Sequence, residues 1–228
     1  LQFTRYRHGA RCYLAVHGGF DIPKWLNSYA TNFKAGAGGY HGSCLKKDAE
    51  LPIKKAQDYS LLLKDRNSIF LPWKADVASL YAADSTIRIC NGAAYDQLTR
   101  LSKHRLTASS YIISDQSDRM GYRLIGAALE RLQADELIST AVTAGTIQLL
   151  PNGQLIVLMS DHQTTGGYPV IAHVISADIP SLAQLPSNKM LRFQLTDHDI
   201  AEDLLFQQDH YLQVLENASR FRWSAYFN

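Results

Sequence analysis

The sequence predicts a mainly β fold that ends in a helix, and three observations support this. Residues 145–178 read as two strands joined by a tight turn, followed by a polar loop and a third strand. Residues 1–20 alternate between two faces, as a strand does, up to Gly18 and Gly19. Residues 196–215 carry apolar side chains at the spacing of an amphipathic helix.

The composition is that of a globular protein, with 46% hydrophobic and 19% charged residues in a chain of 228. This length holds one large or two small domains. The longest aliphatic run, Leu155 to Met159, is too short to span a bilayer. The start of the chain lacks both an initiator Met and the apolar core of a signal peptide, so we expect a fragment. Three widely spaced cysteines exclude a fully paired disulfide framework and favour a reducing, cytoplasmic location.

The charge is uneven along the chain. Lys and Arg outnumber Asp and Glu by 12 to 5 in residues 1–75, whereas the acids lead by 16 to 11 in residues 76–228. The basic front has no nucleic-acid motif and no aromatic interleaving, so a solvated face or an anion-attracting cleft is the better interpretation.

The front of the chain contains a strand and a glycine-rich loop. A strand within residues 1–20 has few possible partners, which indicates an incomplete first domain. The glycines of 36–42 miss the dinucleotide fingerprint by one position and lack the Lys-Ser/Thr ending of a phosphate loop. We therefore predict a loop that crosses another backbone closely. Residues 45–53 resemble a turn into a short edge strand.

A second domain is predicted to begin after a linker, giving domains of 1–80 and 81–228. The pattern predicts, in order, a short strand at Ser68–Leu71, a strand at Thr86–Cys90, a short helix at Tyr95–Leu101, and strands at Thr107–Ile113, Leu155–Met159 and Ile171–Ile175. A helical turn at Ser181–Gln184 and a strand at Met190–Leu195 follow. The last helix is expected to have Thr196 as its N-cap and to cover the sheet through Ile200, Leu204, Leu205, Leu212 and Leu215.

The polar loop that follows the Asn152-Gly153 turn and its strand is the first candidate site. It reads Asp-His-Gln-Thr-Thr-Gly-Gly-Tyr-Pro at 161–169, between two apolar strands. Gly166 and Gly167 allow a close backbone approach to a ligand. The alternative is an ordinary connection, because Asp, Thr and Gly are also common turn residues.

The second candidate is the stretch 114–124, in which Arg119 and Arg123 flank Gly121 and Tyr122. A planar guanidinium binds two oxygens of a carboxylate or phosphate at once. The alternative is a surface ion pair of either arginine with a nearby aspartate, Asp115 or Asp118.

Several chemistries are absent from the sequence. It has no His-Glu-x-x-His, no paired cysteines, no nucleophile elbow and no evident metal constellation. Any reaction would then depend on positioning and on polar stabilisation of an anion.

At these polar stretches the sequence resembles the allophanate hydrolase subunit 2 family. This family is also called KipA-like or biotin-dependent carboxyltransferase, and it includes the C subunit of 5-oxoprolinase. The matching segments are Ser-Asp-Arg-Met-Gly-Tyr-Arg-Leu at 117–124, Gly-Thr-Ile-Gln at 145–148, the loop at 161–169, Ile-Ser-Ala-Asp at 175–178, and, at the front, Arg-Cys-Tyr-Leu-Ala-Val at 11–16 with Lys34–Gly42.

The resemblance implies two cyclophilin-like β-barrel domains, the first N-terminally incomplete. It implies as partners a subunit 1 (KipI-like) protein and a protein similar to the A subunit of 5-oxoprolinase. The implied activity is ATP-dependent opening of 5-oxoproline to glutamate, with ATP supplied through the complex. The alternatives are carboxyl transfer from carboxybiotin, as in urea carboxylase, and a non-catalytic KipA-like regulatory role.

The resemblance also suggests roles for the polar residues. The catalytic set, which would stabilise an oxyanion, is Gln148, Gln163, Thr164 and Thr165. The substrate-binding set is Arg119, Tyr122, Arg123, Asp161, Gly166, Gly167 and Tyr168. Two positions depart from the family pattern, His162 for Arg and Val170 for Lys or Arg, and both changes remove positive charge beside the loop.

Overall fold

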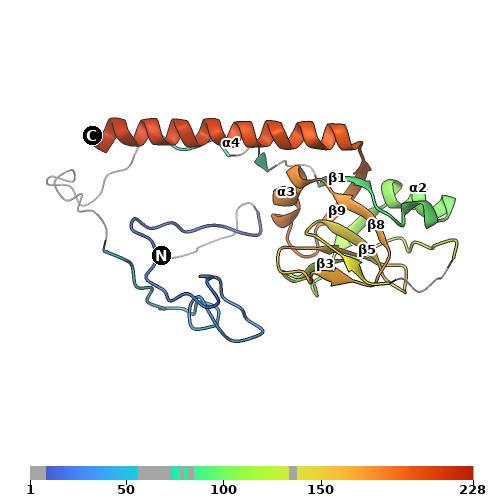
Figure 1. Cartoon of the computed structure of the whole chain (residues 1–228), viewed down its shortest axis with the longest axis horizontal. Helices are drawn as coiled ribbons and strands as arrows, with labels where there is room; N and C mark the ends of the chain where they lie inside the picture. Colours follow the sequence, from blue (N-terminus) through green and yellow to red (C-terminus); the bar gives the residue numbers. More distant parts are fainter. Residues whose placement is uncertain (1–8, 56–72, 78–79, 82–84, 134–137, 228) are drawn as a thin grey trace. The chain divides into compact units, whose positions relative to one another are not determined.

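The computed structural model describes residues 9–55, 73–77, 80–81, 85–133 and 138–227. The chain divides into two units, one of Cys12–Pro72 and one of Trp73–Asn228 together with Leu1–Arg11 (Figure 1). The domain boundary predicted between residues 80 and 81 stays a prediction. The strand predicted at Ser68–Leu71 lies outside the described residues.

The larger unit is built on a closed barrel of seven strands, in the order β1-β8-β5-β6-β3-β2-β9. All neighbours are antiparallel except β1 and β9, which run parallel where the barrel closes. The strands are β1 (Thr86–Asn91), β2 (Ser110–Ile113), β3 (Gly121–Ile125), β5 (Thr146–Leu149), β6 (Leu155–Leu158), β8 (Val170–Val174) and β9 (Met190–Leu195). The predicted mainly β class is confirmed.

The barrel is filled by the apolar side chains that alternate along its strands. Tyr122 and Leu124 of β3 belong to the core, whereas Arg123 and Ile125 are exposed. The same period of two in the sequence produced the strand predictions. A two-stranded sheet of β4 (Thr140–Ala141) and β7 (Thr165–Gly166) lies outside the barrel order.

The Asn152-Gly153 turn between β5 and β6 is confirmed. The Gly153 N–H donates to the Leu150 carbonyl at 2.9 Å, so Pro151 and Asn152 occupy the centre of the turn. Gly153 has φ +78°, a left-handed conformation that glycine adopts without strain.

Two predicted elements differ from the structure. The helix expected at Tyr95–Leu101 is a 3₁₀ turn, η2 (Tyr95–Gln97), followed by a separate helix α2 (Arg100–Ala108). Thr99 has extended backbone and accepts a hydrogen bond from the Ser102 N–H, so it caps a new helix. That helix runs through Ala108, so the strand that was predicted to begin at Thr107 begins at Ser110 instead.

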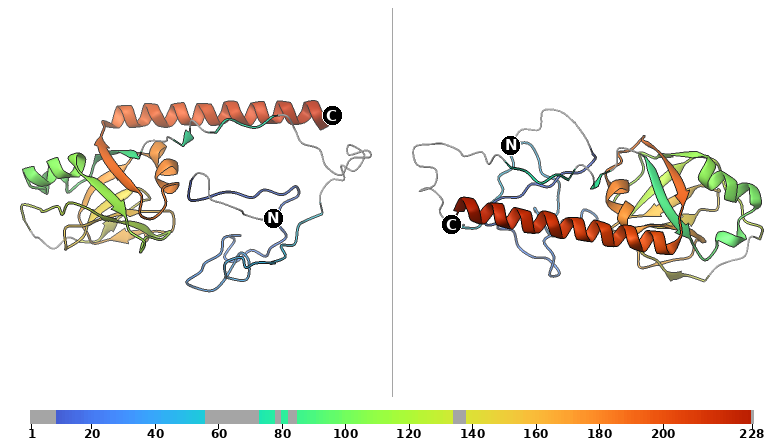
Figure 2. Two further views of the ribbon diagram at one scale, coloured as in Figure 1. Left: turned by 180° about the vertical axis from the view of Figure 1, so that it is seen from behind. Right: turned by 90° about the horizontal axis from the view of Figure 1, so that it is seen from above.

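Two short helical segments, η3 (Ser176–Asp178) and α3 (Ile179–Ala183), lie between β8 and β9, and α4 (His198–Phe227) follows β9. Helix α4 begins one residue later than predicted, since the Ala201 N–H donates to the Asp197 carbonyl, which makes Asp197 the residue before the helix. Its first turns lie on the barrel, where Ala201 and Leu204 pack on an apolar cluster (Figures 1 and 2). Ile200 and Leu212 are exposed, so only part of the predicted stripe covers the sheet.

The smaller unit contains turns and isolated bridges in its described part. Residues 12–20 of this unit form no regular strand, and the described bridge there joins Phe20 to Ile53. The strand predicted here from alternation alone was therefore wrong for the described residues, since a strand also requires a hydrogen-bonded neighbour. The predicted close crossing of the glycine loop is confirmed, because a Cβ on Gly38 would lie 2.5 Å from the backbone carbonyl oxygen of Ala30.

Within the described residues, no helix combines the length and apolar character needed to cross a bilayer. The same residues contain no group of three or more His, Cys, Asp or Glu side chains able to hold a metal ion.

Candidate functional site

The polar loop at 159–169 is a crossover that runs over the outside of the barrel. Strands β6 and β8 both pair antiparallel with β5, which lies between them, so they run parallel to each other. The loop that joins them must therefore return along the length of β5. This path explains why all four residues of β5 are buried, both those facing the core and those facing outward.

Gln148, on the outer face of β5, lies under this loop. It is 1% exposed, and its Nε2 donates to the Tyr168 carbonyl at 3.5 Å. A Cβ on Gly166 would lie under 3.0 Å from the same Nε2, so only glycine fits there without displacement. The structure thus brings Gln148, Gly166 and Tyr168 together, with Gln148 placed to position the loop backbone.

The loop presents its polar groups to solvent. Gln163, Thr164, Thr165 and Gly167 are exposed. The Thr164 carbonyl accepts from the Val142 N–H at 3.1 Å, and β7 then pairs with β4. The backbone is held on its inner side while the amide and hydroxyl groups remain available for a ligand.

Arg119 and Asp161 form a two-point ion pair at the beginning of the loop. The Arg119 Nε lies 3.0 Å from Asp161 Oδ2, and Nη2 lies 3.1 Å from Oδ1. The Asp161 N–H also donates to the Arg119 carbonyl. The partner of Arg119 is therefore Asp161 and not Asp115 or Asp118; Asp118 instead accepts from the Met120 and Gly121 N–H groups.

Tyr122 and Arg123 do not join this group. Tyr122 points into the barrel, where its hydroxyl accepts from Arg11 Nη1 at 2.7 Å and donates to the Ala183 carbonyl at 3.4 Å. The next residue, Arg123, points to the opposite, solvent-exposed face of β3. Adjacent strand residues face opposite ways, so Tyr122 and Arg123 cannot bind one ligand together.

His162 is engaged by its own neighbour. Its Nδ1 lies 2.5 Å from the Gln163 carbonyl oxygen, so Nδ1 carries the proton and donates. The His162 N–H is bonded to the Met159 carbonyl. This position therefore stabilises the first turn of the loop.

A polar contact lies beside Gln148, between the buried Thr146 on the same face of β5 and the half-buried His173. Thr146 is fully buried, and its hydroxyl lies 3.4 Å from Nδ1 of His173 on β8. Burial, and then the nearby His198, lower the pKa of His173. Both effects disfavour the charged form of the imidazole.

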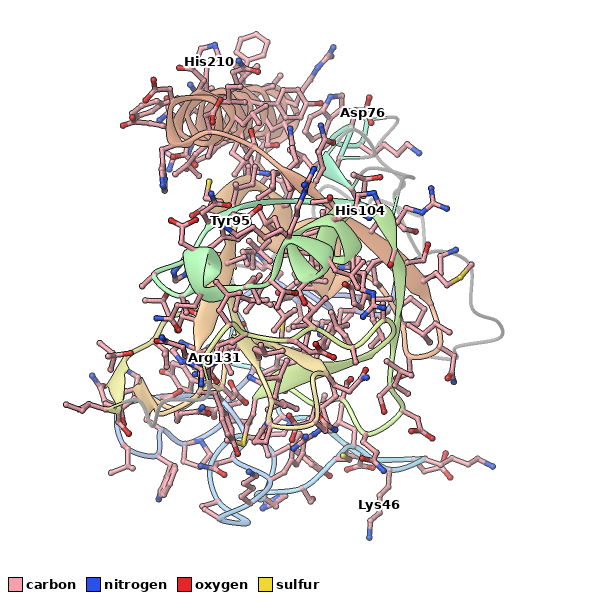
Figure 3. All side chains as sticks on the ribbon, turned by 90° about the vertical axis from the view of Figure 1, so that its right-hand side faces the viewer. Lys46, Asp76, Tyr95, His104, Arg131 and His210 are labelled. Carbon is pink, nitrogen blue, oxygen red and sulfur yellow. The ribbon has the colours of Figure 1, made fainter. Side chains whose placement is uncertain are left out.

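A groove of about 820 Å³ opens where the loop ends, and it contains residues that the sequence analysis missed. Its walls are the segment 128–133, the turn 150–153 and the loop residues Gly167, Tyr168 and Pro169. Arg131 lines it on the side of the barrel that also carries Tyr95 and His104 (Figure 3). Segment 128–133 has no recognisable motif, so only the fold reveals its place in the groove wall.

A closed β-barrel with a polar loop and a groove at one end is typical of proteins that bind a small molecule. The chain belongs to the family described as "Carboxyltransferase domain, subdomain A and B", whose model matches residues 1–195. The family resemblance inferred from the motifs is confirmed.

Two curated relatives are similar over most of the chain. The C subunit of 5-oxoprolinase from Escherichia coli K12 is 38% identical over 94% of this chain and 66% of its own length. The protein of the same name from Haemophilus influenzae is 36% identical over 94% of this chain and 65% of its own length. The chain thus spans about two thirds of the length of these relatives.

Among solved structures, the urea carboxylase of Kluyveromyces lactis superposes with a TM-score of 0.75 and 22% identity. The match covers 91% of this chain and 20% of that one. At this identity the likeness supports the fold alone.

Proposed function

We propose that the chain is the counterpart of the C subunit in an ATP-dependent 5-oxoprolinase, which opens 5-oxoproline to glutamate together with partner subunits. The observation that carries the proposal is the 38% identity to the C subunit of a 5-oxoprolinase over 94% of the chain. The partners in this proposal are a subunit 1 (KipI-like) protein and a protein similar to the A subunit of 5-oxoprolinase.

The crossover loop supplies the groups that such a reaction requires. Attack of water on the lactam carbonyl places negative charge on its oxygen, and fixed N–H and O–H donors stabilise that charge. Gln163, Thr164 and Thr165 are exposed donors on a backbone held by β4 and β5, and the Gly166 and Gly167 amides stand beside them. In this proposal Gln148 acts through the loop backbone and not on the substrate.

ATP is assigned to the partner subunits. A phosphate loop needs glycines that lead into a helix N-terminus. The glycine cluster 36–42 is followed by turns and extended chain, with no helix in residues 9–55. A cytoplasmic location belongs to the same proposal, supported by Cys12, Cys44 and Cys90, which are all free thiols.

The test is glutamate formation from 5-oxoproline and ATP by the full-length protein reconstituted with its partner subunits. Activity that is lost when this protein is omitted would establish the proposal. A complex that assembles and binds ATP but forms no glutamate would reject it.

The family description favours a second candidate, a module that transfers a carboxyl group from carboxybiotin. The exposed donors of the loop would then bind the ureido oxygen of biotin. Decarboxylation of free carboxybiotin by the full-length protein, without partners or ATP, would favour this function over 5-oxoproline opening. A complex that assembles with the partner subunits but neither forms glutamate nor decarboxylates carboxybiotin would indicate a regulatory role.

A further inference from the structure

Three segments from different parts of the sequence meet at the end of the barrel where the crossover loop begins. The Gly145 N–H donates to the carbonyl of Leu158, which ends β6, and the Gly145 carbonyl accepts from the N–H of Val174, which ends β8. The crossover loop and the segment between β8 and β9 therefore leave the barrel at the same end. The N-terminal segment joins them there, because the Ala10 N–H donates to the carbonyl of Gln184 in the segment before β9.

The backbone of Arg11 is fixed at this end of the barrel. Arg11 belongs to the larger unit, together with the barrel. Its N–H donates to Oε1 of Gln184 at 3.0 Å. A Cβ on Gly9 would overlap the same Oε1, so the N-terminal segment lies directly against Gln184. Two backbone hydrogen bonds, from residues 10 and 11, thus hold this segment on the barrel.

The side chain of Arg11 is held at one corner of its guanidinium. Nη1 donates to the Tyr122 hydroxyl at 2.7 Å and also to the Ala183 carbonyl. The guanidinium carbon lies 5.7 Å from the centroid of the Tyr122 ring, which is within the range of a cation–π contact. Tyr122 is 4% exposed and belongs to the barrel core, so it gives the guanidinium a rigid support.

The other edge of the Arg11 guanidinium is open. Nη1 is used by its two contacts, whereas Nε and Nη2 have no partner among the described residues. None of the ion pairs among these residues includes Arg11, and the residue is exposed. The N–H groups of Nε and Nη2 lie side by side in one plane and match the two oxygens of a carboxylate.

Arg88 and Arg119 use this same edge for a carboxylate. In each of them, Nε faces one oxygen and Nη2 faces the other oxygen of a single aspartate, Asp178 and Asp161 respectively. Both arginines are therefore paired within the protein. Arg11 presents the same edge with no carboxylate of the described residues on it, so it can pair with the carboxylate of a ligand.

We propose that Arg11 binds the carboxylate of the substrate through its Nε and Nη2 edge, with Tyr122 as the residue that positions the guanidinium. The inference deepens the proposed function and rests on it for the identity of the substrate, a cyclic amide that carries a carboxylate. It gives Arg11 the anion-binding role that the sequence assigned to Arg119 and Arg123. It also places the lactam at the end of the crossover loop that carries Gln163.

The test compares 5-oxoproline with its neutral carboxamide by calorimetric titration of the full-length protein. We expect Arg11→Gln to weaken 5-oxoproline binding about 10- to 100-fold, the value of a charge-assisted pair, while leaving carboxamide binding unchanged. Arg11→Lys keeps the charge without the planar fork and should lose less. Tyr122→Phe removes one support of the guanidinium and should weaken 5-oxoproline binding about 3- to 10-fold. The matched control is Arg100→Gln, which removes an equal charge from an exposed position at the start of α2.

The outcomes separate this inference from the proposed function. An unchanged preference for the carboxylate in Arg11→Gln would overturn the inference, and so would a wild-type protein that binds neither ligand. Equal losses of both ligands in Arg11→Gln would show that Arg11 only holds the barrel end together, which also overturns it. If Arg11→Gln abolishes the preference but the complex reconstituted with wild-type protein forms no glutamate, the site stands and the proposed reaction fails. If the complex forms glutamate with the same KM for wild type and Arg11→Gln, the reaction stands and the site fails.

Discussion

The contact between Gly166 and Gln148 provides the sharpest test of how the crossover loop is held on the barrel. In Gly166→Ala the new methyl group would lie under 3.0 Å from Nε2 of Gln148, which is buried. The amide must then rotate away and lose its bond to the Tyr168 carbonyl. We expect a loss of about 2–3 kcal/mol in the free energy of unfolding, from overpacking and one broken hydrogen bond.

Gln148→Ala should cost about 2 kcal/mol by itself, because it removes a hydrogen bond and leaves a cavity under the loop. The double variant Gly166→Ala/Gln148→Ala should also lose about 2 kcal/mol in the free energy of unfolding, since the methyl group added at position 166 enters the space that the amide vacates. The expected coupling free energy is therefore about 2 kcal/mol, within the range for residues in contact.

The measurement must report on the barrel alone. The three tryptophans are Trp25, Trp73 and Trp223, none of which lies in a barrel strand, so native-state hydrogen exchange of β5 and β6 amides is the suitable method. The control is Gly126→Ala, whose Cβ would meet Tyr111 and not Gln148. The losses in the free energy of unfolding caused by Gly126→Ala and Gln148→Ala should add in the double variant within about 0.5 kcal/mol. If the losses caused by Gly166→Ala and Gln148→Ala add equally well, the idea that Gln148 supports the loop is refuted.

Three further predictions concern the Arg88–Asp178 ion pair, the half-buried His173 and the loop. Asp178 accepts from the backbone N–H, Nε and Nη2 of Arg88, so Asp178→Ala should cost about 3 kcal/mol by thermal or urea unfolding, and Asp178→Glu should recover part of this. The pKa of His173 is lowered in the fold, so the unfolded chain binds a proton at higher pH than the folded chain does, and the free energy of unfolding should fall as the pH drops below about 6.5. His173→Gln should make the free energy of unfolding less dependent on pH in this range. An equal pH dependence in both proteins would contradict this prediction. Gln163→Ala should reduce turnover about 10²- to 10³-fold with unchanged stability if its amide stabilises an oxyanion, and an unchanged rate would exclude that role.

The strands were predictable because burial alternates with a period of two, and that period is visible in one sequence. β1 and β9 begin where the apolar alternation begins, and β6 begins where a continuous apolar run begins. Residues 9–20 show the same alternation without a regular strand, because the pairing partner is a property of the fold. The end of α2 was misjudged for a related reason: a cap at Thr99 starts a helix that overrides the β preference of Thr107.

The candidate site was only partly predictable, because a motif marks neighbours in sequence and a groove is made of neighbours in space. The loop at 161–169 was identified from its polar composition, and it does lie on the surface beside a groove. The pairing of Arg119 with Asp161 and the inward direction of Tyr122 depend on which strands are adjacent. Arg131 follows no pattern in the sequence and enters the groove wall only because it forms a bridge with Leu98.

The crossover also explains why structural and functional residues are mixed within one motif. A parallel connection over a buried strand needs an inner side that satisfies the strand's polar groups, and the Tyr168 carbonyl does this for Gln148, while Gly166 leaves room for the Gln148 amide. The outer side of the same loop is then free of packing constraints, which leaves Gln163 and Thr165 exposed on a rigid backbone. Precise placement of donors requires such a backbone, so the loop suits an anion-stabilising site because its other face is part of the barrel's cover.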